Sequence, residues 1–471
     1  MNFFEERKLT AEHIEMEATE ELLKDLFSEK RGYILSNYPT LNGLEISFTK
    51  DVEFYTFKTK SILMCDNPFL YQSKGYGILD PFKIKMKDRV YDIPRGAKSI
   101  SFKLKEMELS GNLLEINYQF ASERKSFFRA LIPLVKNAKP PLRYLLGRAI
   151  IWKKSFKAAG YIDVKINEHD IGIYDYTLNE QDYFIIDVKS KVSYHVFNQI
   201  IETIQYGYGF ISGFLLRNNI IVLQSKDPNY TNIEGFKYCK LKDNVISLLE
   251  IYNPDLHMSY FNLKSKQYFP ISVFSDLLEK MFNSRPLLRA IRTMTQARNQ
   301  PVEIETAAFY IALETVKQIV IDENMEKIQP IKEKSYSKKL VKQLKSVVKP
   351  LPAEKFNDKN AVIRKIENIN SVGNTDAFAL AFKCVGIKLS KEDIECISMR
   401  NKFLHGNVPY DHESDEVRNK ELSIINLSAH LLTCSLILKY AGYSGVVKNY
   451  LKYLDLINGF NQINQPLFRK I

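Results

Sequence analysis

The hydrophobic period of the chain changes near residue 270, and this change most limits what the chain can fold into. Before it, aromatic and β-branched residues alternate with polar ones over residues 45–63 and 99–120, the period of a strand with one buried face. After it, apolar residues recur every three to four positions, the period of a helix. The pattern predicts a multidomain α+β protein: a β-rich, sandwich-like region over residues 1–270, then an all-α region over 271–471.

Local signals add detail to this division. An opening amphipathic helix is expected over residues 11–28, and the sequence Ser110-Gly111-Asn112 predicts a hairpin turn between two alternating runs. In the second region, a helix over residues 420–440 is predicted by apolar side chains at helical spacing, namely Ile424, Leu427, Leu431, Cys434 and Leu438. Because His430 and Cys434 belong to this segment, we interpret both as core residues rather than ligands.

No segment of the sequence predicts secretion, membrane insertion or metal binding. The first residues, MNFFEERKLT, lack the basic stretch and apolar run of a secretory signal. No run approaches the ~18 uninterrupted apolar residues of a membrane span. The five cysteines are scattered without a CxxC pair, a pattern that predicts neither a zinc ribbon nor a thioredoxin-type centre. We therefore expect a cytoplasmic protein with reduced thiols, no cofactor and no bound metal.

Positive charge is concentrated in one part of the chain. The net charge is +12, and residues 327–365 contain 12 Lys or Arg against 3 Asp or Glu. Two interpretations of this run stay open: a solvated helix face, or a surface that contacts the RNA backbone. The candidate RNA-binding residues of the second interpretation are the lysines of the densest part, Lys338, Lys339, Lys342 and Lys345.

The most informative segment is LSKEDIECISMRNKFLHGNVP, residues 389–409. Ser390 followed by Asp393 predicts a capped helix start, and Gly406 predicts its end. Asn401 and His405 are four residues apart and therefore share one face of this helix. Arg400 is rotated from His405 by roughly 140°, but its long side chain can still reach the same patch.

These three residue types suit RNA cleavage without a metal. The reaction needs the ribose 2′-hydroxyl deprotonated, the 5′-oxygen leaving group protonated and the charge of the pentacovalent phosphate stabilised. Histidine performs acid–base chemistry near neutral pH, and a guanidinium matches phosphate oxygens geometrically. An asparagine can orient either the histidine or the phosphate. A structural histidine at a helix end is the alternative interpretation of His405.

The segment RNKFLHGNVP, residues 400–409, resembles the Rx4–6H motif of the HEPN superfamily, in which the residue after the arginine is typically Asn, Asp or His. The helical region that contains it fits a HEPN bundle. The layout of a β-rich half followed by a HEPN half is similar to that of the ApeA family of bacterial anti-phage proteins.

This resemblance implies a metal-independent endoribonuclease that leaves a 2′,3′-cyclic phosphate and a 5′-hydroxyl. It also implies a homodimer whose composite site takes Arg400, Asn401 and His405 from both subunits. Glu314 is the candidate supporting acid, with an ordinary exposed helix residue as the alternative. The implied role is abortive infection, in which host or phage RNA, with tRNA as one candidate, is cut after the N-terminal half senses a phage-derived trigger.

Two other functions are weighed against this one. The first is a catalytically silent HEPN bundle that acts as an interaction scaffold. The second is a Mg²⁺-dependent PD-(D/E)xK nuclease, in which two carboxylates hold the metal and a lysine orients water. Its candidate residues surround a strand end: Asp170, Asp175, Asp187, Lys189 and Gln199. A second Asp-Val-Lys at residues 163–165 indicates that alternating strands produce this pattern by chance, and we favour that interpretation.

Overall fold

The structure is a computed structural model in which the chain forms two compact units, residues 1–283 and 284–471. The protein is α+β: a large, mostly antiparallel sheet in the first unit is followed mainly by helices. The structure describes residues 12–14, 16–27, 30–35, 45–51, 54–60, 77–79, 82–86, 89–94, 97–103, 108–113, 115–134, 145, 148–152, 155–178, 181–216, 219–239, 246–247, 249–370, 374–406, 409–410, 413–459 and 463–471.

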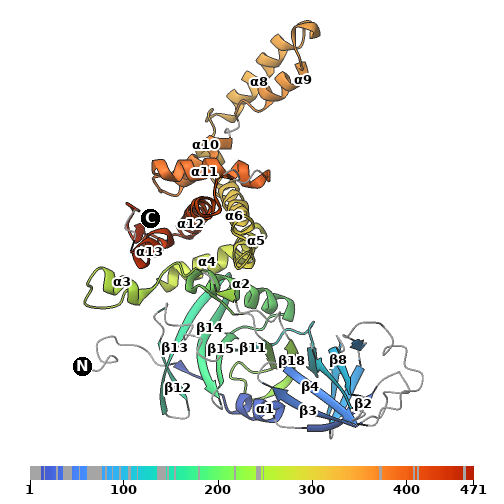
Figure 1. Ribbon diagram of the computed structural model, residues 1–471. Helices are drawn as coiled ribbons and strands as arrows, with labels where there is room; N and C mark the ends of the chain where they lie inside the picture. The colour runs from blue at the N-terminus through green and yellow to red at the C-terminus, as the bar shows by residue number, and fades with distance from the viewer. Residues whose placement is uncertain are drawn as a thin grey trace. The chain divides into compact units, whose positions relative to one another are not determined.

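One series of hydrogen-bonded strands forms the first part of the sheet in this unit (Figure 1). Its order is β1, β12, β13, β14, β15, β11, β17, β18 and β10, and their bounds are Glu12–His13, Arg148–Trp152, Ser155–Ile166, His169–Leu178, Gln181–Val188, Phe127–Pro133, Ile220–Ser225, Ile233–Cys239 and Glu115–Tyr118. Neighbours are antiparallel except β1 and β12. The strands that the alternating pattern predicts between residues 161 and 190 are confirmed.

A second series continues from β10. It runs through β7, β6, β2, β3, β4, β9, β8 and β5, with bounds Arg89–Ile93, Phe82–Met86, Lys30–Leu35, Glu45–Asp51, Phe54–Lys60, Glu108–Leu113, Ala97–Lys103 and Gly77–Leu79. The predicted turn at Ser110-Gly111-Asn112 is wrong. These residues lie inside β9, because Ser110 and Asn112 pair with β4 on one side and β8 on the other. A short separate pair is formed by β16 and β19, Phe214–Leu215 and Ile246–Ser247.

Helices cover both faces of the first series. The helices of this unit are α1, α2, α3 and α4, with bounds Glu17–Phe27, Tyr194–Ser212, Pro254–Tyr260 and Ile271–Asn283. On β11, the Phe128 ring stacks on Phe197 of α2 with centroids 5.3 Å apart. The next residue, Arg129, donates to Thr19 of α1. Because consecutive strand residues point to opposite faces, α1 and α2 lie on opposite sides of the sheet.

The aromatic segment QYGYGFIS, residues 205–212, forms the C-terminal part of helix α2 and is buried. A Cβ on Gly207 would lie 2.5 Å from Leu278 of α4, so glycine permits the close approach of these helices. Gly213 ends the helix with φ of 73°, a left-handed conformation that glycine adopts at little cost. Since α4 packs on α2 and β13, residues 271–283 belong to the first unit. The two compact units divide between Asn283 and Ser284.

The second unit is built around two long helices. Helices α5 to α13 have the bounds Arg285–Gln296, Val302–Glu323, Met325–Ile328, Lys334–Val348, Lys359–Glu367, Asn374–Cys384, Lys391–Leu404, Asp415–Tyr440 and Tyr450–Ile457. Strands β20 and β21, Val446–Lys448 and Phe468–Lys470, form a small pair. Helix α6 packs against α5, α10, α11 and α12. Asn426 of α12 donates to Thr306 of α6 at 3.0 Å within this core.

Helix α12 is the one helix in the described ranges that is long and apolar enough to cross a membrane by length and composition. Of its most apolar window, 78% is buried within the protein, as expected of a core helix. His430 on this helix packs edge-on against Phe309, and burial lowers its pKa to about 3. The interpretation of His430 and Cys434 as core residues is confirmed.

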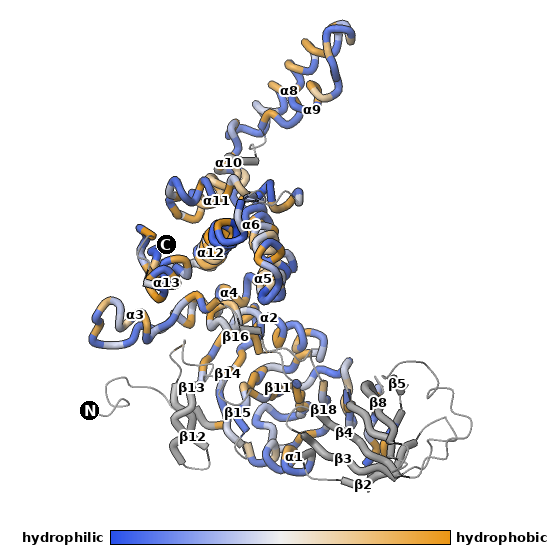
Figure 2. The backbone as a smooth tube through the Cα atoms, viewed as in Figure 1, coloured by the Kyte–Doolittle hydropathy of each residue, from blue (hydrophilic) through white to orange (hydrophobic). Residues whose placement is uncertain are grey.

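Helices α8 and α9 form an antiparallel hairpin that extends from the bundle (Figure 1). Lys345 pairs with Glu367 across it, and Lys359 Nζ donates to the Leu351 carbonyl at 2.6 Å. Apolar and polar residues alternate along both helices (Figure 2). The half-buried residues Leu340, Leu344 and Val348 form the apolar stripe of α8. Most other α8 side chains are exposed to solvent.

Candidate active site

Helix α11 begins and ends where its sequence predicts. The Ser390 hydroxyl accepts from the Asp393 N–H at 3.2 Å, and the Asp393 carboxylate accepts from the Ser390 N–H at 2.8 Å. Arg469 of β21 donates twice to the same carboxylate, at 2.7 and 2.6 Å. At the other end His405 is the C-cap and Gly406 has φ of 74°. The segment is therefore a short, firmly capped helix.

The inner face of α11 packs on α6. Tyr310 of α6 donates to the Cys396 carbonyl at 2.7 Å, and its ring lies 5.7 Å from the Phe403 ring. Arg400, four residues after Cys396, is on the same inner face and is only 7% exposed. Asn401 and His405 lie on the exposed face. Arg400 is therefore buried and Asn401 and His405 are exposed, although all three lie near the same helix end.

Arg400 is held in a defined position by contacts from three helices. Its Nε and Nη2 donate to Asn401 Oδ1 at 3.2 and 2.7 Å. Its Nη1 lies 3.5 Å from Glu314 Oε1 of α6. Its Cζ lies 4.5 Å from the centroid of the Phe378 ring of α10, a cation–π geometry. The structure therefore brings Arg400, Asn401 and Glu314 together, three of the four residues that the sequence analysis names as candidates for the site.

His405 is placed differently. Its backbone N–H donates to the Asn401 carbonyl at 3.1 Å. Within the described ranges, its exposed imidazole makes no hydrogen bond, and no ion pair or hydrogen bond joins it to Arg400. Arginine and asparagine are therefore in contact with each other, whereas the His405 imidazole is exposed.

A lysine that the sequence reasoning missed belongs to the same cluster. Lys317, one turn after Glu314 on α6, is 5% exposed, and its Nζ lies 4.8 Å from the centroid of the Phe378 ring. Burial lowers the pKa of its ammonium; Glu314 opposes this shift and the Arg400 charge adds to it. In the sequence, the burial of Lys317 is indicated by its position between the core residues Val316 and Val320.

Exposed apolar side chains occur on the two helices that carry these residues. Ile304 and Ile311 of α6 are 55% and 48% exposed, and Ile394 of α11 is 54% exposed. Ile304, Ile311 and Glu314 recur at spacings of seven and three, so they follow one face of α6. The exposed face of α6 therefore carries Ile304 and Ile311 and, one turn further along, the Glu314 carboxylate that contacts Arg400.

The competing metal site is not assembled. Asp187 accepts from Arg129 Nε at 2.8 Å and Nη2 at 2.9 Å, and from the Tyr174 hydroxyl at 2.9 Å. Lys189 donates instead to Asp163 at 2.9 Å. No group of three or more potential metal ligands occurs among the residues that the structure describes.

Strand alternation explains why Asp175 and Gln199 do not join Asp187. Tyr174 shares the face of Asp187, so Asp175, the next residue on β14, points to the opposite face. Gln199 belongs to α2, which covers that opposite face. The sheet therefore separates Asp175 and Gln199 from Asp187, whereas a PD-(D/E)xK centre would need them together.

Asp187 serves the fold through a buried ion pair. Arg129 is 1% exposed, and its Cζ lies 4.1 Å from the centroid of the Tyr230 ring. Burial disfavours the charged guanidinium, but Asp187 raises the Arg129 pKa above its ordinary value. Removing one partner of a buried pair leaves the other charge uncompensated.

We therefore expect Asp187→Ala to lower the free energy of unfolding by about 3–5 kcal/mol. Urea denaturation followed by circular dichroism measures this change. Asp182→Ala is the matched control, because Asp182 is an exposed carboxylate on the same strand and should cost less than about 1 kcal/mol. Equal, small effects of both substitutions would contradict the structural role of Asp187.

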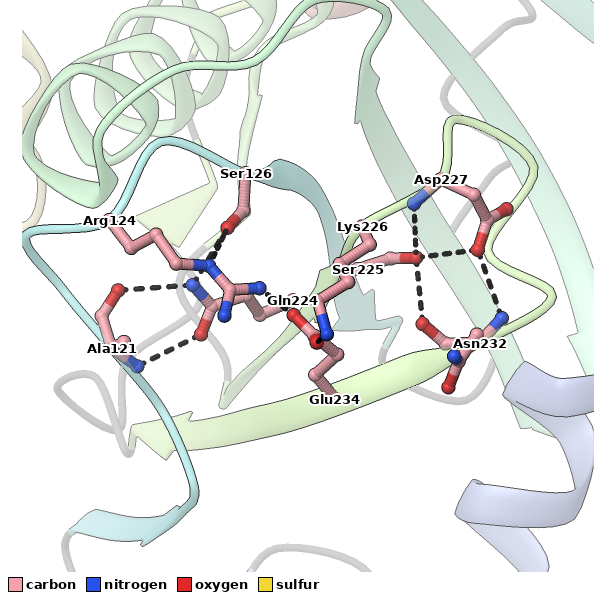
Figure 3. Close-up of polar contacts among 9 residues, drawn as sticks. All are labelled: Ala121, Arg124, Ser126, Gln224, Ser225, Lys226, Asp227, Asn232 and Glu234. Carbon is pink, nitrogen blue, oxygen red and sulfur yellow. Dashed lines mark hydrogen bonds and ion pairs between the residues drawn. The ribbon is translucent and has the colours of Figure 1, made fainter.

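Hydrogen bonds and ion pairs at one end of the sheet connect two loops (Figure 3). Gln224 pairs with both backbone groups of Ala121, at 2.9 and 3.0 Å. Glu234 pairs with Arg124 and with Lys226. Burial tends to raise the Asp227 pKa, but the backbone N–H groups of Thr231 and Asn232 lower it below its ordinary value. These side chains bind one another and close the loop between β17 and β18.

Comparisons of the chain with protein-family models, with curated proteins and with solved structures give no match.

Proposed function

We propose that the second unit is a HEPN-type endoribonuclease that cleaves RNA without a metal. The observation that carries the proposal is the arrangement at the end of α11. Arg400 is buried and oriented by Asn401, Glu314 and Phe378, and His405 is exposed one turn further along. An oriented guanidinium and an exposed imidazole near the same helix end support phosphoryl transfer, because one group binds charge and the other moves a proton.

In this proposal each residue has a defined role. Arg400 binds the phosphate oxygens and stabilises the charge of the pentacovalent state. Asn401 positions the guanidinium through its Oδ1, and Glu314 holds it from α6. His405 transfers a proton to or from a ribose oxygen. The products are a 2′,3′-cyclic phosphate and a 5′-hydroxyl.

The proposed active unit is a homodimer. Transesterification needs a proton removed on one side of the phosphorus and a proton donated on the other, whereas each α11 end presents one histidine. A two-fold axis pairs a surface with its own copy, so a partner subunit would supply the second His405. The exposed Ile304 and Ile311 on α6 offer apolar surface for such a contact.

The proposed biological role is anti-phage defence by abortive infection in the cytoplasm. The β-rich first unit would sense a phage-derived trigger, and the helical unit would then cut host or phage RNA, with tRNA as a candidate. The test is incubation of the purified chain with bulk tRNA or total RNA in EDTA, with and without lysate of phage-infected cells. Cleavage with cyclic phosphate ends supports the proposal. A folded protein that cuts no RNA in either condition supports the silent scaffold instead.

The lysines of α8 are the proposed contacts for the RNA backbone. Lys338, Lys339 and Lys342 are exposed and fall within one face of the helix. Lys345 borders this face and pairs with Glu367, so it is less available for contact with RNA than the sequence predicts. Phosphate contacts release counterions, which makes binding salt-dependent.

We expect the triple change of Lys338, Lys339 and Lys342 to Gln to weaken binding to all RNAs. The slope of log affinity against log salt should become shallower by roughly 0.7 per lysine removed, the value for single strands. Fluorescence anisotropy with an RNA of mixed sequence, between 50 and 300 mM salt, measures the slope.

A control variant makes the same change of net charge in the first unit. Lys125, Lys165 and Lys264 are exposed lysines of the first unit, and their replacement by Gln should leave the slope unchanged. If both triple variants have the wild-type slope, the α8 lysines form a solvated face only.

A further inference from the structure

Two buried cations share one aromatic ring in the second unit. Arg400 Cζ and Lys317 Nζ lie 4.5 and 4.8 Å from the Phe378 centroid. The two side chains come from α11 and α6, and the ring comes from α10. Their relative exposures are 7% and 5%. The three helices thus gather two positive charges in one small, mostly dry space.

Fewer carboxylates than cations lie in this cluster. Glu314 Oε1 lies 3.5 Å from Arg400 Nη1. Asp322, the other acid that affects Lys317, is exposed and accepts a hydrogen bond from Gln318. Within the described ranges the Lys317 ammonium has no hydrogen-bond acceptor. One close carboxylate therefore faces two buried cations.

Two neighbouring cations with one close carboxylate repel each other, and this repulsion is a cost to the fold. The cost disappears when an anion enters and accepts hydrogen bonds from both groups. A phosphate fits this arrangement, because a guanidinium binds two of its oxygens in a fixed plane and an ammonium acts as a compact point charge.

We infer that Lys317 and Arg400 together bind one phosphate group, with Lys317 as the second cation of the site. The inference rests on the proposed function, since it names the residue that completes phosphate binding there. Lys317 touches the phosphate, so it is a binding residue. Asn401 and Glu314 remain positioning residues.

The experiment compares Lys317→Met with Lys317→Arg and with Lys448→Met. Lys448 is a matched control, because it is also a buried lysine of this unit and its Nζ lies 3.9 Å from the centroid of the Tyr453 ring. Thermal unfolding of each full-length protein is measured against rising inorganic phosphate at constant ionic strength. Cleavage of RNA provides kcat and KM separately.

Phosphate should stabilise the wild type and the Lys448→Met protein. Lys317→Met should bind phosphate roughly tenfold more weakly, or worse, and raise KM for RNA. It should unfold no earlier than the wild type without phosphate, because it removes the repulsion between Lys317 and Arg400. Lys317→Arg should restore most of the phosphate effect.

Two outcomes would overturn the inference. One is a wild type whose melting does not respond to phosphate beyond the effect of ionic strength. The other is a Lys317→Met protein with the full wild-type response. If phosphate binding depends on Lys317 but no RNA is cut, the anion site remains and the proposed nuclease fails. If RNA is cut and Lys317→Met changes neither phosphate response nor KM, the nuclease remains and this inference fails.

Discussion

His405→Ala is expected to reduce RNA cleavage by roughly 10²–10⁴-fold, the usual contribution of a general acid or base. The imidazole is exposed, and its side chain contributes no hydrogen bond within the described ranges. Its removal should therefore change the free energy of unfolding by no more than about 0.5 kcal/mol. A large catalytic effect with a small stability effect is the expected behaviour of a residue whose partner is the substrate.

A cleavage assay and a thermal melt on the same preparation measure both effects. His195→Ala is the matched control, because His195 is an exposed histidine on α2 of the first unit and should leave cleavage unchanged. Wild-type cleavage by the His405→Ala protein would remove the histidine from the mechanism. An unfolded His405→Ala protein would assign it a structural role.

Arg400 variants require a different interpretation. Because the guanidinium is buried and contacts Asn401, Glu314 and Phe378, Arg400→Ala removes structural contacts as well as the phosphate-binding group. It should lose cleavage and also lower the melting temperature. Activity alone therefore does not isolate the catalytic part of Arg400, whereas for His405 it does.

Local signals along α11 were sufficient to predict its ends. A serine with an aspartate three residues later satisfies the first N–H groups, and a glycine at Gly406 permits the left-handed residue that ends the helix. These interactions occur within a few residues, so sequence spacing contains them. The contact between Arg400 and Asn401 is of the same local kind.

The contacts that Lys317 and Phe378 make with distant segments were not predicted. Lys317 and Phe378 join the cluster only because α6, α10 and α11 pack together, and spacing along one helix does not reveal that packing. The turn expected at Ser110-Gly111-Asn112 failed for a related reason. Two neighbouring strands satisfy its backbone groups on both sides, and this pairing outweighs the local turn preference.

Ile311→Asp is expected to convert a wild-type dimer to a monomer and to lower cleavage by about 10²-fold or more. The carboxylate would be placed on the outer face of α6, where Ile311 is 48% exposed and Glu314 follows one turn later. Burying two such charges across a two-fold axis is unfavourable. The fold should survive, since the side chain does not face the core. Each monomer would then keep its own Arg400 and His405 but lose the partner's imidazole.

Sedimentation velocity across a concentration series measures the oligomeric state, and a cleavage assay at the same concentrations measures activity. Val347→Asp is the matched control, because Val347 is a 63% exposed apolar residue on α8 and lies outside the proposed contact. Its dimer and its cleavage should match those of the wild type. The composite site requires activity to fall with dissociation, because each subunit contributes one of the two proton-transfer groups. A wild-type protein that sediments as a strict monomer and still cleaves RNA at full specific activity would show that one His405 is enough.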